Sequence, residues 1–531
     1  MYKSGLDVCI GVPSEFPERG VTASATSSNG WDKIGVDVAE AETSSNGSGA
    51  LPSMEWAADH VAEGTIQFLV SMQATKPEIL RGIMVHRFLQ HAPLIWARRT
   101  GLDTLHGLSE VTTTLDEFWS HSWQVKAYLK YINILHRHNS FSAFVVGTLC
   151  AFAAWALCVA GILPDGPAWV MTSRFWSTPA GLVGYYLTLF MWRRQKKAFL
   201  DIACINQTDD LIKAEGLVSM GAFLKRSETL FVLWDVTYVS RLWCLFELAA
   251  FLHSKGLGTD AEKHLVICPV FVGPALVLGQ LGLAAMTVTF SISQLEFIPW
   301  GLVLISALAF PFFMLLAYVV LAHCRSIEMV QDQVRNFTIE NSLSFCCSCG
   351  HVHPQTGSVM LCDRSIIVRC IAAWFESVQE FETIVRGKVL KLLVHQLANQ
   401  VFSYWRIVQA CCPLLWFYLD LPSVHDARET LKVAAIASTY SFMLMPAAAL
   451  ICLRLAYRMR KLFHGRCRKL LFCIGLVAAG ALLFAVGWAF DFFLETLSVL
   501  HFGTDLPGNF AFLVIAGVVN LLLWYGLPDE T

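Results

Sequence analysis

Charged residues are scarce in this sequence. Only 15% of the 531 residues are charged, 55% are hydrophobic, and the mean hydropathy is +0.53. Soluble globular domains carry about 25% charged residues, so the deficit argues against a soluble protein and predicts membrane-spanning segments. The net charge of −2 shows no basic excess, so nucleic acid is not an expected partner.

Signals of secretion and of several enzyme classes are also missing. Residues 1–52 lack the apolar run of a signal peptide and are rich in Ser, Gly, Thr and Asn, which predicts a disordered cytoplasmic tail. The 17 cysteines are scattered, and several lie inside apolar runs, which favours buried free thiols over a disulfide scaffold. No P-loop, protein-kinase, GxSxG or HExxH motif occurs in a fitting context.

Long apolar runs are what the sequence has in quantity. Most of them reach the roughly 20 residues that a helix needs to cross a bilayer. They predict an α-helical multi-pass membrane protein with about eight spans, of which the fifth is short. The runs are 140–163, 175–192, 274–293, 297–324, 407–421, 433–453, 470–494 and 510–527.

Cations alternate between the loops that join these runs. The basic run 193–197 and the basic block 454–469 fall on one side, and the loops on the other side hold few cations. By the positive-inside rule both termini are predicted to be cytoplasmic, in a membrane that the sequence does not specify. Within the runs, strongly polar residues are few, which favours a membrane anchor over a transporter or channel. The main ones are Gln280, Asp420, Asp491 and Asn520.

One cytoplasmic stretch alternates between strand and helix patterns. Residues 198–205 read as a buried strand, 210–226 as a helix, and 229–234 as a second strand. Another helix opens near 241, and 265–271 read as a third strand. Strands separated by single helices predict a cytoplasmic α/β domain with a parallel sheet.

At these residues the sequence resembles a known superfamily. Residues 199–207 are similar to the WIDAICINQ signature of fungal heterokaryon-incompatibility (HET) domains, and 217–227 match the helix that follows it. Residues 241–248 match both the RxWxxQE motif of HET domains and the WCxxEL motif of their relatives, the TIR domains. Residues 266–271 resemble the IPVF strand of TIR domains, and 115–123 resemble their first strand, DVFISH.

The resemblance implies a set of site residues. In TIR enzymes the matching glutamate cleaves NAD at the nicotinamide–ribose bond, which implies Glu247 as a catalytic residue and NAD as a substrate. The alternative is that Glu247 is a glutamate placed near a helix N-terminus, because many TIR-like domains only bind partners. Asp201 and Asn206 likewise have the alternative role of fixing a turn. The ligand-binding candidates are Ser120, His121, Asp201, Asn206, Gln207 and Trp243.

A group of cysteines and histidines lies farther along the chain. It comprises Cys346, Cys347, Cys349, His351, His353 and Cys362. Sulfur and imidazole bind zinc, but paired C-x₂-C units are absent, so reduced cysteines in a loop-rich region are expected in place of a metal site. The rest of 325–406 is predicted to be a helical cytoplasmic module, with a capping box at Ser377-x-x-Glu380.

These readings give a domain plan and three hypotheses of function. The plan places a helical segment at 53–114, the TIR/HET-like α/β domain at 115–139 and 193–273, and a membrane hairpin at 140–192 inserted in it. Two spans at 274–324, the helical module at 325–406 and four spans at 407–527 follow. The first hypothesis is a membrane-anchored signalling or interaction module that self-associates or binds other TIR-like domains. The alternatives are a membrane-tethered NAD-cleaving enzyme and a transporter or channel with an accessory domain.

Overall fold

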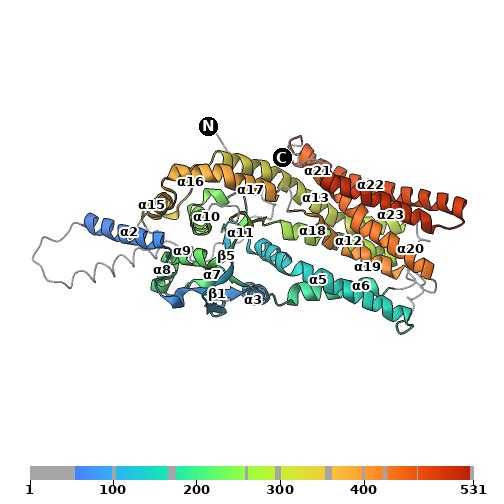
Figure 1. The fold of residues 1–531 in the computed structure, drawn as a ribbon, viewed down its shortest axis with the longest axis horizontal. Helices are drawn as coiled ribbons and strands as arrows, with labels where there is room; N and C mark the ends of the chain where they lie inside the picture. Colours follow the sequence, from blue (N-terminus) through green and yellow to red (C-terminus); the bar gives the residue numbers. More distant parts are fainter. Residues whose placement is uncertain are drawn as a thin grey trace, which may run out of the picture.

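The structure is a computed structural model that describes residues 54–98, 103–122, 124–164, 175–256, 261–292, 300–352, 362–397, 401–421, 427–462 and 465–526. The tail predicted at 1–52 lies outside these residues. The described chain is elongated: a sheet with its covering helices lies at one end, and long helices extend to the other (Figure 1). We call the described parts of 54–122, 193–270 and 336–397 the sheet half, and those of 127–191, 272–335 and 404–526 the helical half.

A six-stranded sheet with the order β2-β1-β4-β3-β5-β6 organises the sheet half. Its parallel strands are β3 Leu115–His121, β4 Lys197–Phe199, β5 Ser227–Trp234 and β6 Leu265–Pro269. In the central strand β3, Phe118 lies opposite Phe199 of β4 and Leu230 of β5. The strand that contains Phe118 therefore pairs beside the one that ends at Phe199, although two long helices separate them in the sequence.

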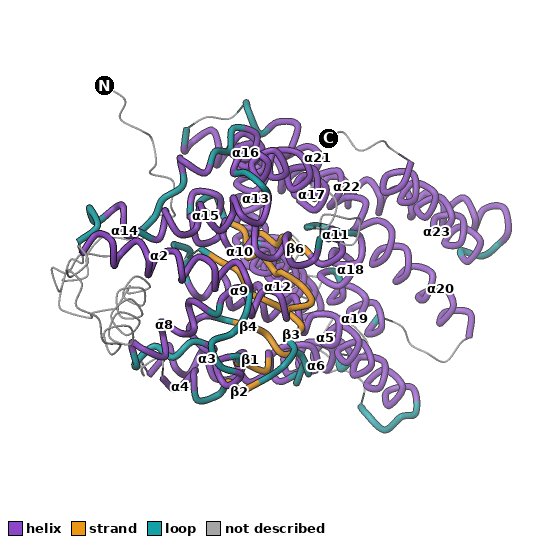
Figure 2. Tube along the Cα trace, turned by 60° about the vertical axis from the view of Figure 1, so that its left-hand side comes forward, coloured by secondary structure: helices purple, strands orange, loops and turns teal. Residues whose placement is uncertain are grey.

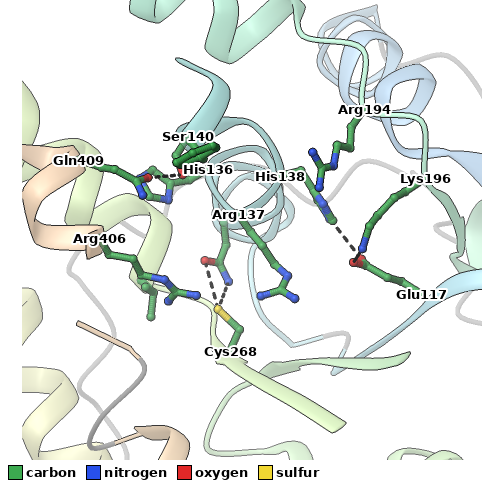
Figure 3. Close-up of a pocket in the computed structure, with 13 residues that line it drawn as sticks. Glu117, His136, Arg137, His138, Ser140, Arg194, Lys196, Cys268, Arg406 and Gln409 are labelled. Carbon is green, nitrogen blue, oxygen red and sulfur yellow. Dashed lines mark hydrogen bonds and ion pairs between the residues drawn. The ribbon is translucent and has the colours of Figure 1, made fainter. Parts of the chain in front are cut away.

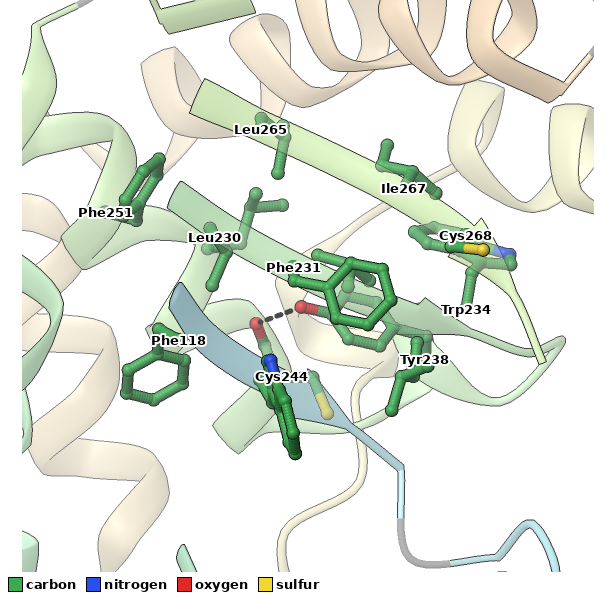
Figure 4. Packing of buried hydrophobic residues seen from close by; sticks show 14 of the residues in the cluster. Phe118, Leu230, Phe231, Trp234, Tyr238, Cys244, Phe251, Leu265, Ile267 and Cys268 are labelled. Carbon is green, nitrogen blue, oxygen red and sulfur yellow. Dashed lines mark hydrogen bonds between the residues drawn. The ribbon is translucent and has the colours of Figure 1, made fainter. Parts of the chain in front are cut away.

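Large apolar side chains hold both faces of the sheet (Figure 4). On one face, Phe118 stacks on Phe199 at 4.5 Å between ring centroids, and Phe199 contacts Phe223 of α9 (Met220–Arg226) at 4.4 Å. On the other, Trp119 packs against Phe88 of α3 (Val85–Arg98) at 5.4 Å. Helices thus enclose the strands, as Figure 2 shows, and the alternation of a strand sends successive residues of β3 to opposite faces.

The described part of the segment 53–114 is mainly helical, as predicted, but it also contributes to the sheet. It contains the helices α2 (Met54–Ser71), α3 and α4 (Asp103–His106), but it also supplies two strands, β1 (Arg81–Met84) and β2 (Ser109–Val111). Both pairings of β1 are antiparallel, so the sheet is mixed rather than wholly parallel. The helical spacing of the apolar residues misled the prediction: Ile83 is buried because it lies in a strand, and Gly82 allows close approach, since a Cβ there would lie 2.7 Å from Leu115 Cδ2.

The helical half contains six helices that are long and apolar enough to cross a membrane among the residues described. They span Ala127–Val159, Val272–Ser291, Val303–Arg335, Arg428–Met459, Arg466–Phe502 and Leu506–Tyr525. Their outer surfaces are apolar; in α22 (Arg466–Phe502), Phe492 and Leu500 are 61% and 76% exposed. Exposed apolar faces of this extent indicate a protein embedded in a lipid bilayer.

Two of the eight predicted spans differ from the other six. The run 175–192 forms α6 (Ser177–Met191), a helix of only 15 residues. The run 407–421 is divided at Cys411 into α18 (Tyr404–Ala410) and α19 (Cys412–Asp420), and nearly every residue of α19 is buried. Both are shorter than the roughly 20 residues that an upright span requires, so the described residues contain six helices of spanning length where the sequence predicted about eight.

The predicted boundary at 139/140 has no counterpart in the backbone. A single helix, α5 (Ala127–Val159), begins after β3 and continues for 33 residues. Its first turns cover the sheet, and Trp119 stacks with His138 at 5.9 Å. The remainder packs against α6 and α12 (Val272–Ile292) in the helical half. This helix therefore joins the two halves without a break.

The polar residues inside the predicted spans make structural contacts. Asp420 accepts hydrogen bonds from the backbone N–H groups of Ser177 and Thr178 at 2.8 and 2.9 Å, so it caps the N-terminus of α6 from α19. Asp491 accepts a hydrogen bond from the Tyr440 hydroxyl at 3.0 Å. Such contacts account for buried polar groups in a membrane without a transported ion.

The segment that follows the third long helix is helical, as predicted for 325–406. Ser377 caps α16 by accepting a hydrogen bond from the backbone N–H of Glu380 at 3.1 Å, the expected half of the capping box. The module packs on the sheet half through α15, which contacts α10 (Leu242–Lys255) and α2. Its elements are the end of α13 (Trp300–Arg335), α14 (Phe345–Ser348), α15 (Asp363–Phe375), α16 (Val378–Ile384) and α17 (Leu390–His395).

Candidate functional site

The carboxyl ends of the parallel strands bring several predicted residues together. Ser120 and His121 end β3, and Asp201 opens α7 (Asp201–Cys204) directly after β4. Glu247 lies in α10 (Leu242–Lys255), which follows β5. Ligands of open α/β sheets bind at this edge, so the position agrees with a site even though the four residues come from three separate parts of the chain.

Glu247 belongs to a buried hydrogen-bonded chain. The Ser120 hydroxyl donates to the Glu247 carboxyl group, and Ser120 Oγ lies 2.7 Å from the hydroxyl oxygen of Tyr238, which is fully buried. Burial, together with the negative charge of Asp201, raises the pKa of Glu247 to about 8, although Ser120 and Arg241 act in the opposite direction. The carboxyl group is therefore largely protonated at about pH 7.

The pKa of Asp201 is shifted in the opposite direction to that of Glu247. Its carboxylate lies 3.6 Å from His121 Nε2, and its own Oδ1 accepts a hydrogen bond from the backbone N–H of Ile202 at 2.8 Å. Burial opposes ionisation, but the charges of His121 and Lys130 outweigh it and lower the pKa of Asp201. One edge of the sheet thus carries a protonated and an ionised carboxyl group, the kind of pair that acid–base catalysis uses.

The remaining predicted residues form contacts within their own loop or helix. Asn206 Oδ1 accepts hydrogen bonds from the backbone N–H groups of Thr208 and Asp209 at 2.8 and 3.0 Å, which is an Asx turn. Gln207 Nε2 donates to the backbone oxygens of Asp201 and Ile205. These bonds match the alternative in which the polar residues after β4 fix a turn.

The motif helix α10 is held on its other side by the helical module. Trp243 is half-buried, and its ring meets that of Phe246 edge-on at 5.6 Å between centroids. Phe246 is fully buried and lies 5.4 Å from the ring of Trp374 in α15. Packing against this additional helix accounts for a large apolar residue at position 246.

Two residues of the site, and Glu117 on the opposite face of β3, were not identified from the sequence. Tyr238 bonds to Ser120 from the short helix before α10, and Lys130 lies 3.4 Å from His121 Nδ1, measured from Nζ. Glu117 is buried in the middle of β3. Only Glu117 left a signal, because a carboxylate within a buried strand requires a partner; the contacts of the other two depend on tertiary placement.

The cysteine and histidine group is also brought together in part. Cys346, Cys347, His351 and Cys362 place one ligand atom each within 4.8 Å of one another. Cys349 stays outside this cluster, and His353 lies outside the described residues. Four members of the group thus meet in a small turn, an arrangement that is compatible both with the expected reduced cysteines and with a metal site.

The edge of the sheet positions a proton donor, Glu247, and a carboxylate, Asp201. Packing against α15 fixes the helix α10. The chemistry of this edge is inferred from the positions and protonation states of Glu247 and Asp201. A comparison with models of known protein families finds no match, and neither do comparisons with curated proteins or with solved structures.

Proposed function

We propose that the protein is a membrane-anchored TIR/HET-like interaction module that signals by self-association. The observation that carries this proposal is the state of Glu247. Its carboxyl group is bonded to Ser120 and has a pKa of about 8, so it is mostly uncharged. An uncharged glutamate that is bonded to the protein interior is poorly suited to stabilise the positive charge that develops when nicotinamide departs.

The helical half supplies the anchor in this proposal. Its long helices expose apolar faces, and the polar residues named in them bond to neighbouring helices. With α6 and the α18–α19 pair counted as spans, the chain crosses about eight times and the cation alternation places both termini in the cytoplasm. An acceptor site for glycosylation inserted beside Gly465 tests this: it stays unmodified if the proposal is right, and modification in the lumen contradicts it.

The NAD-cleaving enzyme is the second candidate, because one observation favours it. The protonated Glu247 and the ionised Asp201 lie at the same edge of the sheet, as an acid and a base of one reaction would. The transporter alternative lacks such support, since the intramembrane residues Asp420 and Asp491 serve as structural acceptors.

Nicotinamide release from NAD by the solubilised protein separates the two candidates. The interaction module predicts the same negligible release from the parent protein and from Glu247→Gln. An activity in the parent that falls at least about tenfold in Glu247→Gln establishes the enzyme instead. Asn206→Ala is the matched control, because it alters a motif residue whose bonds are confined to its own turn.

A further inference from the structure

Three thiols and one imidazole meet in a small turn of the helical module. Cys346 and Cys347 lie in α14, His351 follows it, and Cys362 precedes α15. The sulfur atoms of Cys347 and Cys362 are 3.8 Å apart, and Cys346 Sγ is 3.1 Å from His351 Nδ1. All three cysteines are free thiols.

These distances agree with those of a tetrahedral zinc site. Zinc binds thiolate sulfur at about 2.3 Å and imidazole nitrogen at about 2.0–2.1 Å. In a tetrahedron, such bonds place two sulfurs about 3.8 Å apart and a sulfur and a nitrogen about 3.5 Å apart. The observed sulfur pair has this spacing, and the sulfur–nitrogen contact is slightly closer.

The backbone turns sharply to bring His351 to the cysteines. Both Gly350 and His351 have left-handed conformations, with φ of 64° and 61°. The backbone N–H of His351 donates to the carbonyl oxygen of Cys346 at 3.0 Å, which closes the turn. A non-glycine residue in this conformation costs free energy, and ligation of a metal would offset that cost.

We infer that Cys346, Cys347, His351 and Cys362 bind a structural zinc ion. Four protein ligands occupy every position of a tetrahedral ion, so the site has no open position for a substrate. The chain pattern C-C-x₃-H-x₁₀-C lacks the usual paired C-x₂-C units, which is why the spacing alone did not predict it.

The zinc would stabilise the helix that carries Glu247. Leu343, just before α14, donates a backbone hydrogen bond to the Ser240 oxygen at 2.6 Å and accepts one from the N–H of Leu242 at 3.1 Å. After Cys362, α15 packs along α10. The cluster therefore links two segments that both contact α10, one at its N-terminus and one along its side.

Metal analysis of the full-length purified protein tests the inference. We expect about one zinc ion per chain, and a tetrahedral thiolate spectrum when cobalt replaces zinc. Cys347→Ser and Cys362→Ser are chosen because both residues are half-buried. Each should weaken zinc binding at least about tenfold.

The same loop provides a matched control. Cys349 lies two residues from Cys347 and is not part of the cluster, so Cys349→Ser should keep its zinc. An equal loss of zinc in Cys349→Ser overturns the assignment. So does a parent protein that is purified without zinc and takes up neither zinc nor cobalt in tetrahedral form, a result that does not depend on whether any variant folds.

A second and independent feature is a basic cavity between the sheet half and the helical half (Figure 3). Its volume is about 270 Å³. The charged groups that line it are Glu117, Arg137, Arg194, Lys196 and Arg406, with His136 and His138 beside them.

The positive charge of this cavity is only partly neutralised. Lys196 Nζ lies 3.1 Å from Glu117, which His138 approaches at 3.3 Å. Among the described residues, no carboxylate forms an ion pair with Arg137, Arg194 or Arg406. Arg137 Nε is buried without a hydrogen-bonding partner. The guanidinium group of Arg137 also lies over the ring of Phe231 at 4.5 Å. Guanidinium groups with spare donors in one cavity are suited to a phosphoryl group.

The rim of the cavity combines charge with an apolar surface. Arg194 is exposed, and Phe141 on α5 is 66% exposed. Basic pockets beside membrane helices bind phosphorylated lipid headgroups, and a soluble phosphate compound offers the same chemistry. We propose that the cavity binds a phosphoryl group through Arg137, Arg194 and Arg406.

Binding measurements with two probes test this second proposal and distinguish the sources. The probes are inorganic pyrophosphate and nanodiscs that contain a phosphatidylinositol phosphate. Binding of only the nanodiscs identifies a lipid headgroup, and binding of pyrophosphate identifies a soluble ligand. In either case Arg194→Gln and Arg406→Gln should weaken binding at least about tenfold, while the exposed Arg468→Gln should change it less than about twofold.

Arg194→Gln keeps the test informative if Arg406→Gln does not fold, because Arg194 is exposed and its side chain forms no hydrogen bond or ion pair with the described residues. The proposal is overturned if neither probe binds the parent protein. It is also overturned if Arg468→Gln loses as much affinity as Arg194→Gln.

Discussion

The two halves of the molecule use buried polar groups differently. In the helical half, Asp420 and Asp491 accept hydrogen bonds from neighbouring helices and so stabilise the contacts between helices. In the sheet half, Glu247 and Asp201 lie at one edge with pKa values shifted in opposite directions. The contrast teaches that a carboxyl group that only joins two helices needs no functional explanation, whereas two carboxyl groups that lie together at the carboxyl ends of parallel strands mark a candidate site.

The largest effect is expected for Asp420→Ala in the helical half. This change removes the acceptor for the backbone N–H groups of Ser177 and Thr178 and for the Thr178 hydroxyl. Loss of a cap and of several buried hydrogen bonds should lower the free energy of unfolding by about 3 kcal/mol. Thermal unfolding in detergent measures it, with the exposed Asp332→Ala as the control. Equal stability of the two variants would show that Asp420 does not stabilise the contact between α19 and α6.

A smaller loss of unfolding free energy is expected for Glu117→Gln. Glu117 lies at the cavity between the two halves. Removing this charge leaves Lys196 without its carboxylate and takes an acceptor from His138 and the Trp119 ring N–H. Because Lys196 is partly exposed, the free energy of unfolding should fall by about 2 kcal/mol, less than for a fully buried pair. Glu110→Gln removes an exposed ion pair with Arg87 and should change it by less than about 1 kcal/mol. Similar losses of unfolding free energy in the two variants would show that the buried Glu117 contributes no more than an exposed ion pair.

The pH dependence of Glu117 follows from its environment. Burial opposes ionisation, but His138 and Arg137 outweigh it and hold the pKa of Glu117 well below its ordinary value. A lowered pKa stabilises the fold above the ordinary value of about 4.5 and loses that contribution as the pH falls. Glu117→Gln should therefore flatten the acid side of the stability profile.

The sheet edge should show the opposite pH dependence. The pKa of Glu247 is raised from 4.5 to about 8, so its contribution is fully present below about pH 4.5 and is lost as the pH rises through about 8. Between these pH values the free energy of unfolding of the parent protein should fall by roughly 1 kcal/mol more than that of Glu247→Gln. The expected difference is modest because the side chain is half-buried. Parallel unfolding curves at about pH 5 and pH 8 for both proteins would contradict the raised pKa.

The sequence was sufficient for those features that depend on local pattern. The strands that contain Phe199 and Leu230 could be predicted because each is a short apolar run, the strand that contains Phe118 only from its resemblance to the first TIR strand, and the Ser377 cap because its motif is local. β1 could not be predicted, since its four residues share the spacing of a helix and become a strand only by pairing with β2 and β4.

The candidate site was predictable to a similar degree. Ser120, His121, Asp201 and Glu247 were found from motifs, and the structure brings them to one edge. The protonation state of Glu247 was not predictable, because it depends on burial by tertiary packing and on the charge of Asp201. The cysteine and histidine group was noted from the sequence, but which four of its members meet depends on the turn at Gly350 and His351.

The oligomeric state of the protein in nanodiscs tests the central claim most directly. If the sheet half is an interaction module anchored by the helical half, mass photometry at increasing protein density should show dimers or larger assemblies. Glu247→Gln should assemble to the same extent, because that carboxyl group is already uncharged. A protein that remains monomeric at every density, while releasing nicotinamide from NAD in a manner that depends on Glu247, would contradict the account.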